Sequence, residues 1–238
     1  MDVEVLRIHA QLARDGLAVD LRTVTASVRR LGIEGISPRR FRPVARIGEM
    51  RTHSIPDLVE RGWDTGRLNA VWIMDITYLR TNEGWVYLCA VRDACSRRVI
   101  GWAMDQTHTS TLVERALRMA QVLRGELPHD EVFHADRGTQ YTSAQLAEAC
   151  AALQVRQAVG RTGTCWDNAM QESLWSTLKA EFYNRRLWAT RSEAIQATGR
   201  WIEQFYYRTR LHSALGYTTP VEFERTHTTI NNQMAEAA

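Results

Sequence analysis

F-H-A-D-R-G-T-Q-Y-T-S, residues 133–143, and N-A-M-Q-E-S-L-W-S-T-L-K, residues 168–179, are the two segments that decide the fold. The first is an apolar strand pattern that ends in Asp136 and a glycine loop, and the second is a helix pattern that carries Glu172. Thirty-five residues lie between these two acids. A third acid, Asp75, ends the earlier apolar run V-W-I-M-D. Three carboxylates on separate elements predict a site for divalent metal ions.

The acid in the first strand pattern lies on a defined face. Side chains in a strand alternate between faces, so Asp75 shares its face with Ile73 and Thr77. A carboxylate inside an apolar run is costly to bury unless it is paired or bound to a cation. Ligands collect at strand ends in open sheets, so the acids of the strands at 71–79 and 131–135 converge if these two strands are neighbours.

The helix pattern that carries Glu172 has two faces. At about 100° per residue, the face expected to contact the core consists of Met170, Leu174, Leu178 and Phe182. The opposite face is expected to hold Glu172, Ser176, Lys179 and Tyr183. Lys179 lies about 20° from Glu172 after two turns, so the acid and the only lysine of the chain are predicted to border the same site.

The predicted ligands suit a hard cation. Carboxylate oxygens in this number favour Mg²⁺ or Mn²⁺, and two such ions about 3.5–4 Å apart would clamp the attacking and leaving oxygens of a phosphoryl transfer. This chemistry needs no side-chain nucleophile, and the sequence offers no good one. The alternative is that each acid is ordinary, because further acids lie near predicted strand or helix ends: Asp93, Asp105, Asp130 and Asp167.

The positive charge of the chain comes almost entirely from arginine. Lys179 is the only lysine among 238 residues, so 29 of the 30 basic residues are arginines, and the formal net charge is +3. A GC-rich genome produces this bias without functional meaning. Residues 22–51, however, hold eight arginines against two acids, which is the local basicity expected for phosphate contacts, although a solvated charged surface gives the same pattern. The arginines predicted to contact DNA are Arg29, Arg30, Arg39 and Arg40.

Two short helices are predicted near the N-terminus. Residues 3–14 carry apolar side chains at helical spacing, and Gly16 ends the pattern. Residues 21–31 follow, with Asp20 as N-cap and Gly32 at the end. Two helices joined by a glycine turn, with arginines on the second, are typical of a DNA-binding helix-turn-helix. The alternative is a helical hairpin that only packs on the next domain.

Short connections predict an antiparallel meander followed by alternating helices and strands. The first three strand patterns follow one another too closely for a crossover connection, and helix and strand patterns then alternate through residue 159. The predicted fold is α/β, with a ribonuclease H-like mixed five-stranded sheet flanked by helices. The predicted strands are 71–79, 85–94, 98–105, 131–135 and 155–159, and the predicted helices of this part are 110–123, 143–153, 168–186 and 190–208.

Four regions are predicted along the chain. They are a helix-turn-helix-like region at 1–50, a linker at 51–70, a catalytic core at 71–189, and a helical extension with a frayed polar tail at 190–238. The four cysteines show no zinc or disulfide spacing and are expected to be reduced thiols: Cys89, Cys95, Cys150 and Cys165. The sequence contains no run of eighteen apolar residues, so it predicts no membrane span.

Four blocks of the sequence resemble the signature blocks of one superfamily. They are W-I-M-D-I-T-Y, H-A-D-R-G-T-Q-Y-T-S, G-T-C-W-D-N-A-M-Q-E-S-L-W-S-T-L-K and H-S-A-L-G-Y-T-T-P. In this order they resemble the DDE transposase and retroviral integrase superfamily, and most of all the OrfB-type transposases of the insertion sequence three family. The resemblance covers about residues 71–225.

The resemblance implies an integrase catalytic core that performs strand cleavage and strand transfer at the ends of an insertion sequence. Its implied catalytic residues, Asp75, Asp136 and Glu172, would bind two Mg²⁺ or Mn²⁺ ions, and water and then a DNA 3′-hydroxyl would be the nucleophiles. The residues that it implies contact DNA or lie near the site are Lys179, Gln140, Tyr141, Trp166, Asn168, Arg210 and His212. Packing is an alternative role for Trp166.

The implied partners are double-stranded DNA, as element ends and target, and further copies of the chain on that DNA. Relatives usually carry more sequence upstream, and a separately encoded upstream-frame protein supplies end recognition and a coiled coil, for which this sequence shows no heptads. Tyr207 also stands where the family commonly has an asparagine. These departures indicate one frame of a two-frame element, or a shortened copy. The expected location is the bacterial cytoplasm, on the nucleoid when bound to DNA.

Three functions are compared on this basis. The first is a metal-dependent transposase. The second is a shortened, non-transposing copy that acts only as a DNA-binding protein, and it would show end binding without metal-dependent chemistry. The third is a nuclease of the same fold, whose products would never be joined to target DNA.

Overall fold

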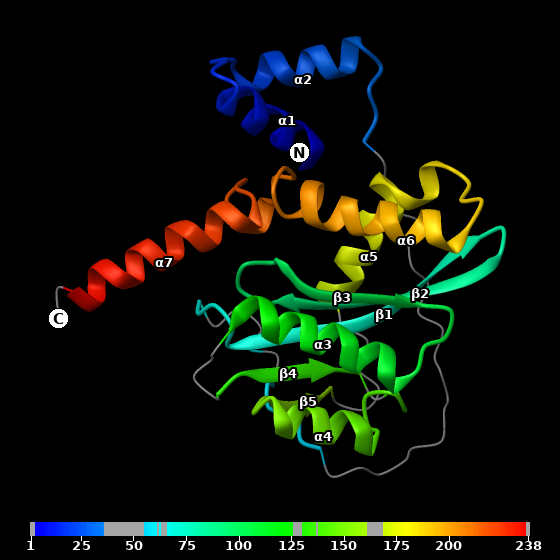
Figure 1. Ribbon diagram of the computed structural model, residues 1–238. Coiled ribbons are helices and arrows are strands. Elements are labelled where there is room, and N and C mark those ends of the chain that lie inside the picture. Colours follow the sequence, from blue (N-terminus) through cyan, green and yellow to red (C-terminus); the bar gives the residue numbers. More distant parts are fainter. Residues whose placement is uncertain are drawn as a thin grey trace. The chain divides into compact units, whose positions relative to one another are not determined.

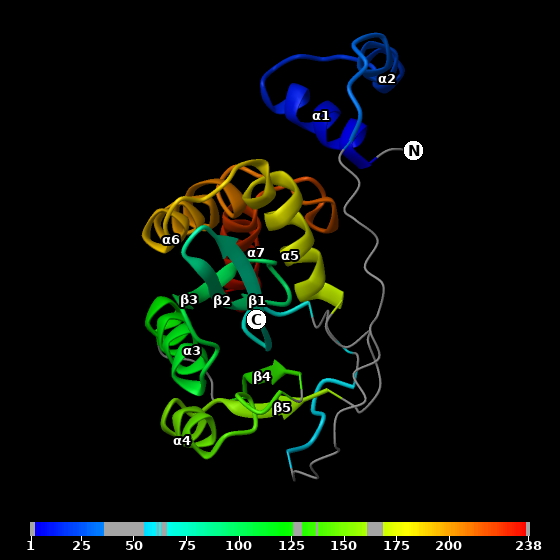
Figure 2. The same cartoon turned by 90° about the vertical axis from the view of Figure 1, so that its right-hand side faces the viewer.

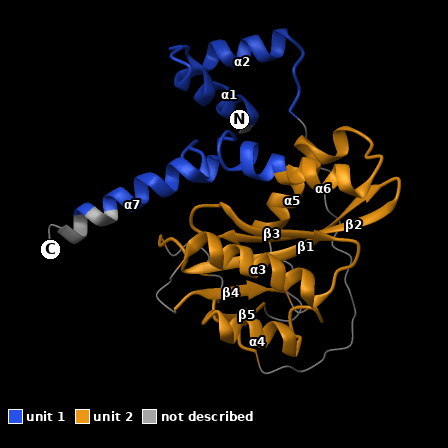
Figure 3. Cartoon of the chain, viewed as in Figure 1, with its two compact units in different colours: residues 1–38, 200–238 blue, residues 39–199 orange. Residues whose placement is uncertain are grey.

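The chain divides into two compact units, residues 39–199 and residues 1–38 with 200–238 (Figure 3). The computed structural model describes residues 3–35, 55–60, 62, 66–125, 130–136, 138–160 and 169–236. In this part of the chain, no helix is long and apolar enough to cross a membrane. The predicted region limits at residues 50, 70 and 189 differ from this division and stay predictions.

A five-stranded mixed sheet forms the centre of the larger unit (Figure 1). The strand order is β3-β2-β1-β4-β5, in which β2 is antiparallel to β1 and β3, and β4 is parallel to β1 and β5. The predicted meander and mixed sheet are therefore confirmed. The strands are β1 Val71–Thr81, β2 Gly84–Asp93, β3 Val99–Asp105, β4 Val132–Ala135 and β5 Arg156–Val159.

Helices cover both faces of this sheet (Figure 2). On one face lie α3, Ser110–Arg124, and α4, Ala144–Ala152, which enclose a core that includes Trp72 and Met74 of β1. On the other face lies α5, Ala169–Glu181, whose first residues pack with Val71 and Ile73. Because side chains alternate along a strand, Asp75 belongs to the α5 face.

Local chemistry fixes several of these elements. Ser143 Oγ accepts the main-chain N–H of Leu146 at 3.2 Å, so α4 begins directly after this cap. Gly101 of β3 lies so close to α3 that a methyl group there would overlap the main chain of Ala116 and Ala120. This glycine allows the close approach of the helix to the sheet. Among the described cysteines, Cys89, Cys95 and Cys150 are free and buried, as predicted, and Cys165 lies outside the described residues.

The helix that carries Glu172 is shorter than predicted. It ends at Glu181, Phe182 leaves the helical conformation, and Tyr183–Arg185 forms a 3₁₀ turn before α6, Arg191–Arg200. The predicted exposure of Tyr183 is therefore wrong: this residue is 3% exposed, and its hydroxyl donates to the main-chain oxygen of Arg80 at 3.1 Å. Helical geometry could not place Tyr183, because the helix stops before it.

The smaller unit contains the two predicted N-terminal helices, α1, Val3–Arg14, and α2, Leu21–Arg30. Asp20 caps α2 by accepting the N–H of Arg22 at 2.9 Å, as the sequence predicted. Gly16 and Gly32 both have positive φ, +83° and +62°, which explains why both helices end at glycine. The C-terminal part of the unit has a π-helix at Trp201–Tyr206, a 3₁₀ turn at Ser213–Leu215 and α7 at Pro220–Glu236.

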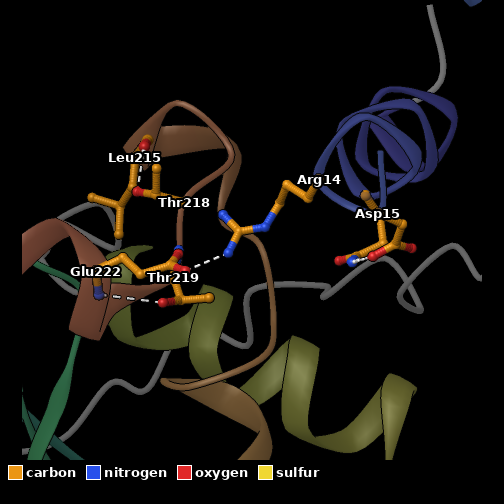
Figure 4. Close-up of polar contacts among 7 residues, drawn as sticks. Arg14, Asp15, Leu215, Thr218, Thr219 and Glu222 are labelled. Atoms are coloured by element: carbon orange, nitrogen blue, oxygen red, sulfur yellow. Dashed lines mark hydrogen bonds and ion pairs between the residues drawn. The ribbon is translucent and has the colours of Figure 1, made fainter. Parts of the chain in front are cut away.

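The frayed tail predicted at residues 231–238 is corrected by α7, which runs as a helix through Glu236. The start of this helix has a defined cap. Thr219 Oγ1 accepts the N–H of Glu222 at 3.3 Å, and the Glu222 carboxylate accepts the N–H of Thr219 at 3.0 Å, which is a capping box. Arg14 of α1 donates to the same carboxylate (Figure 4). This bond is the largest cause that lowers the pKa of Glu222 to about 2.

Candidate active site

The two aspartates predicted to bind metal lie at matching positions of neighbouring parallel strands. In the last recorded pair of β1 and β4, Ile73 lies opposite His134. Extended by two residues, this register brings Asp75 of β1 level with Asp136, the residue that directly follows β4. Asp75 is half-buried, whereas Asp136 is exposed at the end of β4, where its Oδ1 accepts the N–H of Gly138 at 2.9 Å. The sequence left open whether the strands that lead to these two acids are neighbours, and the pairing of β1 with β4 shows that they are.

Glu172 lies in the first turn of α5, on its exposed side. The predicted core positions Leu174 and Leu178 are buried, and the predicted exposure of Glu172 is confirmed. The buried face also contains Gln171 and Trp175, which the apolar stripe did not include. These two residues flank Glu172 on the side of the helix that faces the sheet.

Two hydrogen bonds connect α5 to Asp75 and to its neighbour on β2. Trp175 Nε1 donates to Asp75 Oδ2 at 2.8 Å. Gln171 Nε2 donates to the main-chain oxygen of Ala90 at 2.8 Å, and Ala90 is the cross-strand partner of Asp75 on β2. Because both donors flank Glu172 in the helix, these bonds fix the segment that carries Glu172 against Asp75.

A third contact secures the start of this helix. Arg92 of β2 is 5% exposed and donates to the main-chain oxygen of Met170 at 2.6 Å. Sequence reasoning missed all three contacts. The only available signal was a glutamine and a tryptophan on a helix face that is otherwise apolar, and this pattern does not indicate which strand the face contacts.

The charges of Asp136 and Glu172 act on the carboxyl group of Asp75. Burial raises the pKa of Asp75 to about 7, with the negative charge of Asp136 as the second cause and Glu172 as a smaller one. The hydrogen bond from Trp175 opposes this rise. Burial also lowers the pKa of Lys179, and the charge of Asp75 opposes that change. Lys179 is therefore within electrostatic range of the aspartate.

The three carboxylates do not converge on one point in this conformation. Across the residues that the structure describes, no three His, Cys, Asp or Glu side chains lie close enough together to hold an ion. The charges of Asp136 and Glu172 thus act on Asp75, while the three carboxylates do not form a ligand shell.

The other acids that the sequence offered have structural partners. Asp93 is fully buried, and its two oxygens accept the N–H groups of Asn69 and Ser96 at 2.7 and 2.6 Å. Two more form exposed ion pairs, Asp105 with Arg115 and Asp130 with Arg67. Asp167 lies outside the described residues. These partners give Asp93, Asp105 and Asp130 structural roles.

The residues predicted to contact DNA occupy different environments. Lys179 Nζ lies 4.9 Å from the centre of the Tyr78 ring. Gln140 is half-buried in the loop after Asp136. Tyr141 is 1% exposed in the core between the sheet and α3–α4, so its side chain is unavailable to DNA in this conformation. Burial, with Asp75 as the next cause, raises the pKa of Tyr141 well above its ordinary value, which places it beside the site.

The remaining DNA candidates belong to the smaller unit or lie outside the described residues. His212 is 6% exposed, and its Nε2 lies 3.0 Å from the main-chain oxygen of Tyr206, so it packs inside the unit and does not face DNA. Arg210 is half-buried. Arg29 and Arg30 are exposed in the last turn of α2. The candidates outside the described residues are Arg39, Arg40, Trp166 and Asn168.

Comparison with known proteins assigns the class of this fold and site. An integrase core domain family matches residues 66–165, and a second family of the same description matches residues 153–220. Together the two matches span the whole sheet and α5. The simian T-cell lymphotropic virus intasome, solved in complex with the PP2A regulatory subunit B56 gamma, has a similar fold, with a TM-score of 0.54 and 18% identity over 90% of this chain and 69% of that chain.

Two relatives define the family more closely. Transposase InsF for insertion sequence IS3A of Escherichia coli K12 is 37% identical over 221 residues, which cover 92% of this chain and 75% of InsF. A 31 kDa protein of insertion element IS600 from Shigella sonnei is 32% identical over 221 residues, which cover 91% of this chain and 79% of that protein. The chain therefore belongs to the IS3 family of DNA transposases, whose reaction class is polynucleotidyl transfer.

Proposed function

We propose that this transposase cleaves and joins DNA strands at insertion-sequence ends with two Mg²⁺ or Mn²⁺ ions held by Asp75, Asp136 and Glu172. The convergence of two acids on Asp75 carries the proposal: the parallel neighbour β4 delivers Asp136, and α5 delivers Glu172. Their charges contribute to the raised pKa of Asp75. Hard oxygen donors that repel one another suit a divalent cation, which would draw the open site together.

In the proposed mechanism, bound ions supply activation of the attacking oxygen and stabilisation of the leaving oxygen in an in-line displacement at phosphorus. The chain itself positions the reacting groups. Trp175 orients the Asp75 carboxylate by donating to its Oδ2, and Lys179 supplies a positive charge for a phosphate beside Asp75. Water attacks in the cleavage step, and the released DNA 3′-hydroxyl attacks in the joining step, so no covalent intermediate with the protein forms.

The proposed substrate is double-stranded DNA, both element ends and target, with more than one copy of the chain bound to it. The exposed Arg29 and Arg30 on α2 support phosphate contacts by the helix-turn-helix-like region. For several such contacts, affinity should fall roughly tenfold or more between about 50 and 200 mM salt. Replacing both arginines with glutamine should reduce this slope, and an unchanged slope would limit the region to packing. The upstream-frame partner stays a prediction.

A strand-transfer assay tests the catalytic proposal. Element-end oligonucleotides, target DNA and Mg²⁺ are incubated with the wild type and with Asp136→Asn. Asp136→Asn should lose several kcal/mol of transition-state stabilisation, so its strand-transfer rate should be at least about a hundredfold lower than that of the wild type. Asp105→Asn is the matched control, because Asp105 also ends a strand but pairs with Arg115 on the surface. Unchanged product from Asp136→Asn would contradict the assignment.

The same assay separates the other functions. End binding by the wild type without any metal-dependent product would indicate a protein that only binds DNA. Cleaved ends that never become joined to target DNA would indicate a nuclease.

A further inference from the structure

The outer part of the β1–β2 hairpin extends beyond the rest of the sheet (Figure 1). The pairing of β1 with β4 stops at Ile73, and the pairing of β2 with β3 begins at Tyr87. Within the sheet, residues 78–86, named the arm here, are therefore paired only between β1 and β2. The arm begins three residues beyond Asp75 on the same strand, a distance of about 10 Å along β1.

The two faces of the arm differ sharply in exposure. The inner face carries Leu79, Thr81 and Val86, which are at most 2% exposed. The outer face carries two large aromatic side chains, Tyr78 at 57% and Trp85 at 42% exposed. Strands with one solvated face normally place polar residues on that face. The exposed aromatic pair is thus a departure that the fold does not require.

Cations accompany both aromatic rings. Arg80 Cζ lies 5.1 Å from the centre of the Trp85 ring, and Lys179 Nζ lies 4.9 Å from the centre of the Tyr78 ring. The two rings meet edge to face, with centres 5.3 Å apart. The acid in the turn of the arm, Glu83, accepts the main-chain N–H of Arg191 at 2.7 Å. The outer face of the arm therefore combines aromatic surface with positive charge.

We propose that this outer face binds an unpaired nucleotide of the DNA end by stacking its base on Trp85, with the perpendicular Tyr78 ring against the edge of the base and with Arg80 and Lys179 on its phosphates. Aromatic rings interleaved with cations are the composition that binds single strands. Tyr78 and Asp75 project from opposite faces of β1. Lys179 of α5 lies near both residues, because its Nζ is 4.9 Å from the centre of the Tyr78 ring and the charge of Asp75 acts on it. The inference rests on the proposed function for the identity of the DNA.

The state of the DNA follows from the geometry of stacking. A base inside a duplex presents only its edges, so an exposed indole can stack only on the outermost base pair of an end or on a base that has left the helix. The comparison of a fully paired with a frayed duplex separates these two cases. A protein partner would favour an apolar centre from which charges are depleted, whereas here each ring is paired with a cation. The occupant is therefore an unpaired nucleotide of the DNA end.

A binding experiment without chemistry tests this inference. The full chain is titrated in EDTA against two fluorescent duplexes of one sequence, one fully paired and one with unpaired nucleotides at an end. The wild type should bind the frayed duplex more tightly. Trp85→Ala should reduce this preference roughly fivefold or more, Trp85→Phe should restore part of it, and Phe205→Ala, an aromatic 39% exposed in the other unit, should leave it unchanged.

A second readout reports stacking directly. A 2-aminopurine placed among the unpaired nucleotides should be quenched by the wild type and much less by Trp85→Ala, while the unfolding temperatures of both proteins agree. Equal affinity for both duplexes, or a Trp85→Ala variant with altered self-association and unaltered DNA binding, would overturn the inference. Because no cleavage is measured, failure of the catalytic proposal would not affect this result.

Discussion

Removal of the indole donor that contacts Asp75 is the perturbation with the clearest expected outcome. Trp175→Phe keeps an aromatic ring on the buried face of α5 and deletes the 2.8 Å hydrogen bond from Nε1 to Asp75 Oδ2. A hydrogen bond to a charged group contributes about 1.5–3 kcal/mol. Because this bond lowers the pKa of Asp75, its loss raises that pKa further and disfavours the ionised form that we propose binds metal.

The expected change is therefore in the requirement for metal. If most of that free energy is lost from ion binding, the Mg²⁺ concentration for half-maximal cleavage rises about ten- to a hundredfold. The acidic limb of the pH profile moves to higher pH, and excess Mg²⁺ restores part of the rate. Initial cleavage rates over a series of Mg²⁺ concentrations at several pH values measure both effects.

Trp188→Phe is the matched control for this variant. Trp188 is 2% exposed, and its Nε1 donates to the main-chain oxygen of Tyr183 at 2.9 Å, so the substitution deletes a buried indole hydrogen bond that does not involve Asp75. Both variants should lose stability, because each also leaves a cavity. If Trp175→Phe shows the same Mg²⁺ requirement and pH profile as Trp188→Phe, Trp175 does not position Asp75.

Three further predictions concern stability. The folded pKa of Asp75 is raised from 3.8 to about 7, so its ionisation lowers the stability of the metal-free protein as pH rises from about 4 to 7. Asp75→Asn should remove this loss, which is on the order of a few kcal/mol, in urea unfolding with EDTA. Stability–pH curves of the same shape for the variant and the wild type would contradict this prediction. The folded pKa of Glu222 is lowered to about 2, so its contribution to folding stability is present above about pH 4.5 and is lost as pH falls toward 2. Glu222→Gln breaks the exposed pair with Arg14 and should cost under about 1 kcal/mol at pH 7 and nothing near pH 2 in thermal unfolding. A stability difference that does not change with pH would refute the ion pair. Gly101→Ala should destabilise by about 1–3 kcal/mol in urea because the added methyl overlaps the main chain of α3, and wild-type stability would show that α3 can move away.

Much of the fold is readable from the sequence because short-range rules determine it. Period-two patterns and short turns predict the meander, and Asp20, Gly16 and Gly32 mark helix ends through their own backbone chemistry. The capping box at Thr219 and Glu222 was equally readable from its spacing, but it was not predicted.

The active site was predictable only in part. Asp75 and Asp136 follow from acids at the ends of apolar runs, but strand order is a long-range property, and only the pairing of β1 with β4 brings them together. The roles of Trp175 and Gln171 depend on which strand α5 contacts, and no local pattern carries that information. Tyr183 shows the opposite error, since a helical period was extended past the residue where the helix ends.

The most direct measurement for the central claim, that Asp136 is a metal ligand of the transposition reaction, is strand transfer by Asp136→Cys with Mg²⁺ and with Mn²⁺. A thiolate ligand binds softer cations better than Mg²⁺. The account predicts almost no product with Mg²⁺ and clear recovery with Mn²⁺, while the wild type is active with both. Equal activity of the variant with Mg²⁺, or no recovery with Mn²⁺ by a variant that is folded and binds DNA, would contradict it.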